Sequence, residues 1–286
     1  MTISIAYLGP TGTNTETAAL AYTNWLANET GAESILCPYP NINQTLHSVA
    51  RGETQLAVVP VENSIQGSVA ITLDSLWELE QLQIQQGLTL PISNVLLSRA
   101  TSIEAIHTVY SHPQALAQCQ KWLERFLPSA QLIPTNSTTE ALQYLPRDLS
   151  AGAIASQRAS KIYDLPILAA SINDYPDNCT RFWVLGLKPA LNGSHVSLAF
   201  SIPANVPGAL VKALQVFADR GINLSRIESR PTKRSLGEYL FFIDLEGNIN
   251  EESTKGAIEE LSNCAEVIKI FGNYSVLKIE SSPSDR

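Results

Sequence analysis

The stretch QLAVVPVENSIQG at residues 55–67 shows how the first part of this chain folds. Its apolar run, Leu56–Val61, predicts a buried β-strand, and a helix is expected from Ser68 to Leu79. Between the two lie Glu62, Asn63 and Ser64. Polar side chains at the carboxyl end of a central strand lie where open α/β sheets bind ligands. Helix capping would account for the asparagine or the serine, but not for a glutamate after so apolar a strand.

The same unit, a buried strand followed by a polar helix start, recurs along the chain. The strand 3–8 ends at the turn GPTGT (9–13), and a helix is expected from Thr15 to Asn28. Such a turn places free N–H groups and a helix dipole at one point, which favours anions, although a plain tight turn is the alternative. After an extended crossing segment at 88–98, further strands are predicted at 106–110, 132–134 and 152–155, each followed by a helix start, the first running from 111 to 125. The repetition predicts two α/β lobes around a shared cleft that suits a small carboxylate.

A third region is expected after the turn-rich segment 189–194. Strands are predicted at 195–202, 222–231, 237–245 and 265–279, and helices at 208–220 and 251–262. This βαββαβ order is that of a ferredoxin-like α+β sandwich. The region carries no evident acid–base pair or nucleophile, so catalysis is expected in the two lobes. Residues 281–286 are expected to fray.

Composition narrows the classes of function. The formal net charge of −8 argues against nucleic acid and against anionic membrane surfaces as partners. The four cysteines are scattered and the four histidines form no ligand-spaced cluster, so neither a disulfide frame nor a metal site is expected. The chain starts in a strand pattern without a leader, and no apolar run approaches the ~20 residues of a membrane span. A cytoplasmic protein is therefore expected.

The stretch NCTRFWVL at residues 178–185 places a hydroxyl, a guanidinium and an aromatic ring at the start of a strand expected from Phe182 to Leu187. An arginine so close to an apolar run is either paired with an acid of the protein or available to an anion. The sequence alone does not distinguish these two roles for Arg181.

Six motifs follow one another along the chain. In the first two regions they are Gly9-Pro10-x-Gly12-Thr13, Val58 to Gly67, Ser111 to Ala115 with Gln118, and Thr180-Arg181-Phe182 after Tyr163, Leu165, Leu168 and Asp174; in the third region they are Pro207 to Leu210 and Ile227 to Pro231. Together they resemble the prephenate dehydratase family with a C-terminal ACT domain, over nearly the whole chain. Asn14 and Thr15 stand where the family commonly has an aromatic residue and serine. No N-terminal extension could hold a chorismate mutase bundle, so the monofunctional type is expected.

The resemblance implies a periplasmic-binding-protein-like catalytic region at 1–188, with lobe one at about 1–87 plus 170–188 and lobe two at about 88–169, and an ACT domain at 195–280. It implies conversion of prephenate to phenylpyruvate, carbon dioxide and water without metal or organic cofactor. Thr180 would be the catalytic residue, as a positioned donor to the leaving hydroxyl. Substrate binding would fall to Thr13, Glu62, Asn63, Ser64, Ser111, Gln118, Arg181 and Phe182.

Within that set, Arg181 would anchor a substrate carboxylate, with an ion pair to Glu62 as the alternative. His112 is left out, because a histidine before proline at a helix start is more often structural. The ACT domain would bind phenylalanine as a feedback inhibitor and pair into a homodimer or homotetramer. Its effector site is expected at Gly208, Ala209, Leu210, Asn223, Leu224, Glu228 and Ser229. Arogenate dehydratase and a non-catalytic two-lobed sensor are the competing interpretations.

Overall fold

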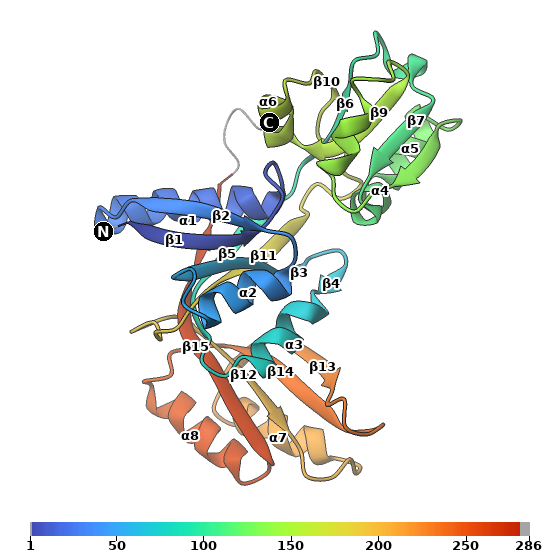
Figure 1. The fold of residues 1–286 in the computed structure, drawn as a ribbon. Helices are drawn as coiled ribbons and strands as arrows, with labels where there is room; N and C mark the ends of the chain where they lie inside the picture. Colours follow the sequence, from blue (N-terminus) through green and yellow to red (C-terminus); the bar gives the residue numbers. More distant parts are fainter. Residues whose placement is uncertain (1, 281–286) are drawn as a thin grey trace.

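The computed structural model describes residues 2–280, so the expected fraying at 281–286 lies outside the described part (Figure 1). Lobe one comprises β1 (Ile3–Leu8), α1 (Asn14–Thr30), β2 (Ser34–Tyr39), α2 (Ile42–Ala50), β3 (Leu56–Asn63), β4 (Gly67–Ser68), α3 (Ala70–Glu78), β5 (Gln83–Pro91) and β11 (Cys179–Gly186). Strands β2, β1 and β3 run parallel, whereas β11 pairs antiparallel with both β3 and β5. The predicted strand–turn–helix units of this lobe are confirmed.

Lobe two carries a separate sheet in the order β10-β6-β9-β7-β8. Its elements are β6 (Asn94–Ser98), η1 (Ile103–Ala105), β7 (Thr108–Ser111), α4 (Pro113–Gln118), α5 (Gln120–Phe126), β8 (Gln131–Pro134), η2 (Glu140–Tyr144), β9 (Ala151–Ser156), α6 (Gln157–Tyr163) and β10 (Ile167–Ala169). The expected single crossing segment at 88–98 is therefore two strands, β5 in one sheet and β6 in the other. The chain crosses between the lobes at 92–93 and returns at 170–178.

Two predicted helices of lobe two differ from expectation. The helix expected at 111–125 is interrupted at Cys119, and the carboxylate of Asp174 accepts hydrogen bonds from Lys121 N (2.9 Å) and Trp122 N (3.1 Å). An acid from the returning segment thus caps α5 from outside. The helix expected near residue 136 forms only the short 3₁₀ turn η2, because a proline at position 146 ends it early.

The C-terminal unit has the predicted βαββαβ order. It consists of β12 (His195–Ser201), α7 (Ala209–Ala218), β13 (Asn223–Pro231), β14 (Tyr239–Glu246), α8 (Glu252–Ser262) and β15 (Val267–Lys278). Its strands lie in the antiparallel order β13-β14-β12-β15. Strand β15 then continues, and Ser275–Lys278 pair in parallel with Gln86–Thr89 of β5. The C-terminal unit and lobe one therefore share one continuous sheet, which the sequence did not predict.

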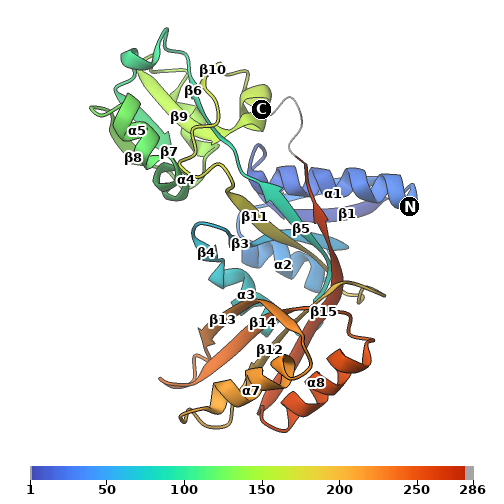
Figure 2. The ribbon, with the colours of Figure 1, turned by 180° about the vertical axis from the view of Figure 1, so that it is seen from behind.

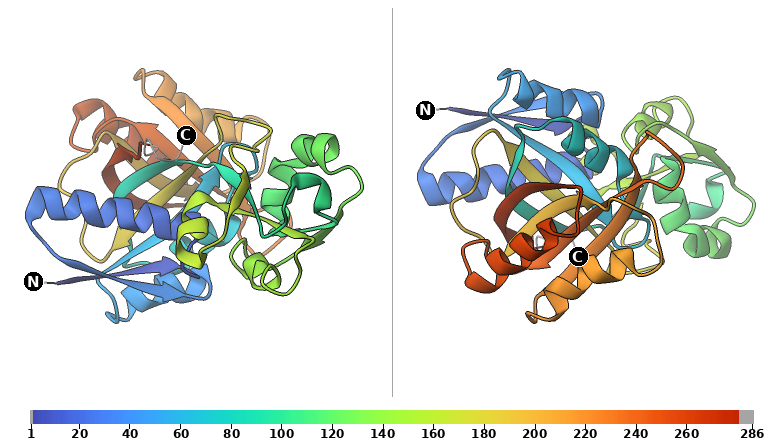
Figure 3. Two further views of the ribbon diagram at one scale, coloured as in Figure 1. Left: turned by 90° about the horizontal axis from the view of Figure 1, so that it is seen from above. Right: turned by 90° about the horizontal axis from the view of Figure 1, so that it is seen from below.

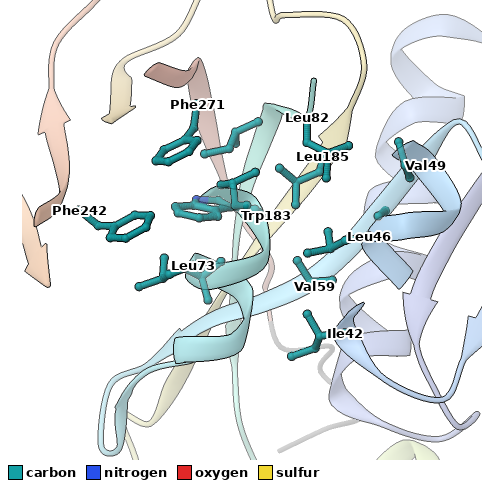
Figure 4. Close-up of a cluster of buried hydrophobic side chains, with 14 of the residues drawn as sticks. Ile42, Leu46, Val49, Val59, Leu73, Leu82, Trp183, Leu185, Phe242 and Phe271 are labelled. Atoms are coloured by element: carbon teal, nitrogen blue, oxygen red, sulfur yellow. The ribbon is translucent and has the colours of Figure 1, made fainter. Parts of the chain in front are cut away.

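Both faces of the C-terminal sheet are covered. Helices α7 and α8 lie on one face, as Figure 2 shows from behind. The buried cluster on this face includes Phe200 and Phe217. The other face buries Phe242 and Phe271 against Trp183 of β11 and Leu73 of α3 (Figure 4). Each large apolar side chain buried in this way contributes about 1.5–3 kcal/mol. This shared core fixes the C-terminal unit on lobe one, while lobe two lies to one side of both (Figure 3).

Candidate active site

A cavity of about 840 Å³ lies between the two lobes. Five residues predicted as catalytic or substrate-binding line it: Thr13, Asn63, Gln118, Thr180 and Phe182. Thr13 comes from the N-terminus of α1, where its hydroxyl caps the helix by accepting from Glu16 N. Lobe one thus supplies the strand ends and a helix start, and lobe two supplies α4, as the repeated sequence pattern indicated.

Thr180 occupies the beginning of β11, directly across from Asn63 of β3. Its side chain is nearly buried, and its hydroxyl oxygen accepts a hydrogen bond from Asn63 Nδ2 at 3.0 Å. Because this oxygen already accepts, the hydroxyl proton of Thr180 is free to be donated into the cavity. The site therefore offers a neutral donor whose oxygen is held in place.

A chain of side-chain amides fixes that geometry across both lobes. Asn63 Oδ1 accepts from the backbone N–H groups of Ile65 and Gln66, so its Nδ2 must face Thr180. The same Oδ1 accepts from Gln118 Nε2 at 3.3 Å, and Gln118 Oε1 accepts from Asn94 Nδ2 at 3.3 Å. The amides of lobe two thereby contact the Thr180–Asn63 pair of lobe one. A change in the closure of the lobes would therefore alter the position of the Thr180 hydroxyl.

Arg181 does not line the cavity. Side chains alternate along a strand, so Thr180 and Phe182 face the cavity and Arg181 points to the opposite face of the sheet. There its Nη1 lies 3.0 Å from Asp244 Oδ2 and 3.9 Å from Glu62 Oε2. The structure therefore corrects two expectations. Neither Arg181 nor Glu62 is placed to hold a substrate in the cavity, and the alternative of a protein ion pair is the one observed.

Two predicted serines also lie outside the cavity lining. Ser64 braces the start of β11, since its backbone N–H donates to Cys179 O and its hydroxyl accepts from Cys179 N. Ser111 is fully buried, and its hydroxyl donates to Ile154 O at 2.6 Å. Both residues support the strands that shape the site, and neither is placed to contact a substrate directly.

Sequence reasoning missed several polar residues that line the cavity: Asn14, Thr15, Asn94, His112, Gln114, Asn136, Ser137 and Thr138. His112 is both the N-cap of α4, with Nδ1 accepting from Gln114 N, and a cavity residue. Burial lowers the pKa of its imidazole. The position of His112, next to Ser111 at the end of a strand, could have indicated a cavity residue. From the sequence, only a structural role at the start of the helix was expected.

Among the described residues that line the cavity, none is Asp, Glu, Lys or Arg. A bound anion would therefore depend on neutral donors and on the N-terminus of α1, where backbone N–H groups and the helix dipole favour negative charge. Residues 2–280 place no group of three or more His, Cys, Asp and Glu side chains together that could hold a metal ion. Of the helices described, none has the length and apolar character needed to cross a bilayer.

The lobes touch at one end of the cavity. Gly12 N donates to Glu16 Oε2 at 2.8 Å, and the same oxygen pairs with Arg158 Nε of α6 at 2.8 Å. Ser156 Oγ donates to Gly12 O at 2.8 Å. Gly12 has φ of +90°, and a Cβ there would come within 3.0 Å of Thr139, so glycine is required at this contact. The GPTGT turn thus joins the lobes rather than only turning the chain.

Comparison with known proteins decides the family. Residues 5–190 match the family model of prephenate dehydratase, and residues 196–263 match that of the ACT domain. The chain belongs to the prephenate dehydratase family.

Relatives of two architectures match the same residues. The chain is 38% identical to the prephenate dehydratase of Lactococcus lactis subsp. cremoris, over 97% of this chain and 99% of that protein. It is 42% identical to the bifunctional chorismate mutase/prephenate dehydratase of Aquifex aeolicus, over 95% of this chain and 73% of that protein. A crystal structure of prephenate dehydratase from Arthrobacter aurescens in complex with L-Phe superposes with a TM-score of 0.83 at 33% identity, covering 99% of this chain and 94% of that one. The fold is accordingly a two-lobed, periplasmic-binding-protein-like catalytic region with an ACT domain.

The ACT domain contains a second cavity, of about 300 Å³, at the start of α7. Of the predicted effector residues, Gly208, Leu210 and Ser229 line it, together with Asn205, Val206, Tyr239 and Phe241, among others. Four predicted residues do not line it: Ala209, Asn223, Leu224 and Glu228. Asn223 and Leu224 lie at the end of β13 that is far from Ser229. Glu228 directly precedes Ser229, so its side chain points to the opposite side of the sheet.

Proposed function

We propose that residues 1–188 convert prephenate to phenylpyruvate, carbon dioxide and water, and that residues 195–280 regulate this activity by binding phenylalanine. Membership of the prephenate dehydratase family supports the reaction. The observation that carries the proposal is the Thr180 hydroxyl, which lines the cavity and whose oxygen accepts a hydrogen bond from Asn63 at 3.0 Å. Because the reaction belongs to biosynthesis, we propose a cytoplasmic location.

The reaction requires little chemistry beyond positioning. The bond between the ring and its carboxylate breaks and releases carbon dioxide, and the electron pair of this bond completes the aromatic ring. The bond between the ring and its hydroxyl also breaks. The hydroxyl takes its bonding electrons and one proton, and leaves as water. Thr180 would donate a hydrogen bond to this departing hydroxyl as negative charge develops on it, while solvent supplies the proton. One aligned donor of this kind typically contributes ~10²–10³ in rate. No step calls for a metal or an organic cofactor.

The polar and apolar parts of prephenate would bind at different parts of the cavity. Backbone N–H groups at Thr13, Asn14 and Thr15 open α1 and would receive one carboxylate. Apolar side chains of Phe182, Ile92 and other residues provide a surface for the ring. The amides of Asn63 and Gln118 would orient the substrate between the lobes.

Regulation by phenylalanine is supported by the related structure that holds L-Phe and by the cavity at the start of α7. Gly208 has φ of +83° and precedes the helix, so N–H groups at the start of α7 would donate hydrogen bonds to the effector carboxylate. Strand β13 is the edge of the long sheet, and its Ile227 is 46% exposed. We propose that a second copy pairs with this edge to form a homodimer or homotetramer.

A comparison of kcat/KM for prephenate with kcat/KM for arogenate tests the proposal. Arogenate carries an ammonium group, which would find no carboxylate partner among the described cavity residues. Leaving a charged donor unpaired costs about 1–3 kcal/mol or more, so kcat/KM for prephenate should exceed that for arogenate at least about fivefold. Phenylpyruvate and phenylalanine formation would be followed separately. Equal turnover would contradict the preference, and binding without turnover of either compound would favour the non-catalytic sensor.

The cavity histidine predicts a pH dependence of substrate affinity. Burial lowers the pKa of His112, so the imidazole is neutral at pH 7 and gains charge only as the pH falls below its ordinary value of about 6.5. A bound dianion favours the protonated form, so KM for prephenate should decrease as the pH falls from about 6.5 to about 5.5. Steady-state kinetics corrected for the uncatalysed rate would measure it. His112→Gln, which does not titrate, is the control, and an identical pH profile in the variant would rule out His112 as the source.

A further inference from the structure

The strands that carry the reaction cavity also face the ACT domain. Thr180 pairs across from Asn63, and the next pair along, Arg181 with Glu62, points to the opposite face of the sheet. A register shift between Arg181 and Phe182 follows immediately. The extra residue is Val61 of β3, because Arg181 pairs with Glu62 and Phe182 with Pro60, and such bulges re-aim side chains beside active sites. One short piece of β11 therefore places a donor in the cavity and a guanidinium against the ACT domain, so a movement of Arg181 would be felt at Thr180.

The ACT residue that holds this guanidinium is Asp244 of β14, which is fully buried. Its Oδ2 accepts from Arg181 Nη1 at 3.0 Å and from Arg226 Nε at 2.8 Å. Its Oδ1 accepts from Ser197 Oγ at 2.6 Å and from Arg226 Nη2 at 3.3 Å. These charge-assisted bonds are the strong kind, and they converge on one carboxylate. The catalytic strand is thus attached to the ACT domain through Arg181.

The other end of the network reaches the effector cavity. Arg226 lies on β13, three residues before Ser229, which lines that cavity. Arg226 is buried and its Nη1 has no hydrogen-bond partner. An unsatisfied buried donor raises the free energy of this arrangement, and so lowers the cost of moving to another. A ligand that displaces β13 would therefore shift Arg226. The carboxylate of Asp244, which binds both Arg226 and Arg181, would shift with it.

We propose that Arg181 is a positioning residue that couples the effector cavity of the ACT domain to Thr180. The inference rests on the proposed function and deepens it, because it assigns the route by which phenylalanine changes turnover. Effector binding at β13 moves Arg226 and Asp244. Arg181 then moves with Asp244, and the adjacent Thr180 loses its alignment with the substrate.

Arg181→Met tests the coupling, because it removes the guanidinium while Asp244 keeps Arg226 and Ser197. Phenylalanine should still bind, with a Kd by calorimetry within about threefold of wild type. Saturating phenylalanine should lower kcat/KM by less than twofold, against the ~5–150-fold typical of allosteric coupling in the wild type. Without effector, kcat should fall about 3–10-fold with KM unchanged, since Arg181 does not line the cavity. Arg181→Lys should restore inhibition, because a single nitrogen of Arg181 contacts Asp244.

Asp74→Asn is the matched control. It removes the charge of a part-buried carboxylate at a second contact between lobe one and the ACT domain, where Arg230 Nε and Nη2 lie 2.9 and 3.1 Å from Asp74 and Lys233 also pairs with it. The substitution leaves β11 untouched. This variant should keep wild-type inhibition. Full inhibition in Arg181→Met, or an equal loss in Asp74→Asn, would overturn the proposal. A failure of the proposed function would instead appear as wild-type protein that does not turn over prephenate.

Discussion

Replacing Thr180 with valine is expected to lower kcat for prephenate by ~10²–10³ or more, with little change in KM. Valine matches threonine in shape, so the strand and the nearly buried position should be kept, while the donor to the departing hydroxyl is lost. Because the hydroxyl acts on charge that develops during the reaction, its removal should affect kcat rather than binding. Steady-state formation of phenylpyruvate would measure both constants.

Thr180→Ser is the control for this change. Serine keeps the hydroxyl and its hydrogen bond from Asn63 Nδ2, so it should retain activity within about tenfold of wild type. If the valine variant kept near-full activity, the role assigned to Thr180 would be wrong. If serine and valine were equally inactive, the hydroxyl alone would not suffice, and the methyl group of Thr180 would be needed as well.

Replacing Asp244 with alanine is expected to lower the free energy of unfolding by about 3–5 kcal/mol, a large share of the ~5–15 kcal/mol of a typical protein. The reason is that Arg226, which is almost completely buried, would lose its carboxylate partner. Arg181 would lose its closest partner as well, and keep Glu62 at 3.9 Å. Urea unfolding followed by circular dichroism would measure the change.

Glu260→Gln is the comparison for that measurement. It breaks an ion pair of similar geometry, Arg220 Nη2 to Glu260 Oε2 at 2.7 Å, but at a partly exposed position on α8. Exposed pairs contribute at most about 1 kcal/mol, so this variant should be nearly as stable as wild type. An Asp244 variant no less stable than this comparison would mean that water reaches the two guanidinium groups.

The elements were predictable where the pattern was local. The βαββαβ unit follows from hydrophobic periodicity, so its strands and helices lie within a few residues of expectation. The break between α4 and α5 at Cys119 was not predictable in this way. The start of α5 is capped by Asp174, which lies more than 50 residues further along the chain. No periodicity reports such a contact.

The candidate site was predictable in part for the same reason. Thr180, Asn63 and Gln118 were found through their motifs, and the structure brings them together. For Arg181, the strand was expected only from Phe182, whereas β11 begins at Cys179, so the alternation that turns Arg181 and Thr180 to opposite sides was not predicted. Its main partner, Asp244, lies 63 residues away in another unit, so the choice between an anion and an ion pair depended on tertiary structure.

The strand β15 has a consequence for how the protein can be divided. Its last residues, Ser275–Lys278, complete the hydrogen bonds of β5, and the ACT strands cover Trp183 and Leu73 of lobe one. A chain cut at residue 188 would keep every cavity residue, yet it would expose an unpaired strand edge and an apolar surface, which together promote aggregation. The regulatory domain is therefore also a structural component of the catalytic one, and loss of feedback is more accessible through single substitutions than through deletion.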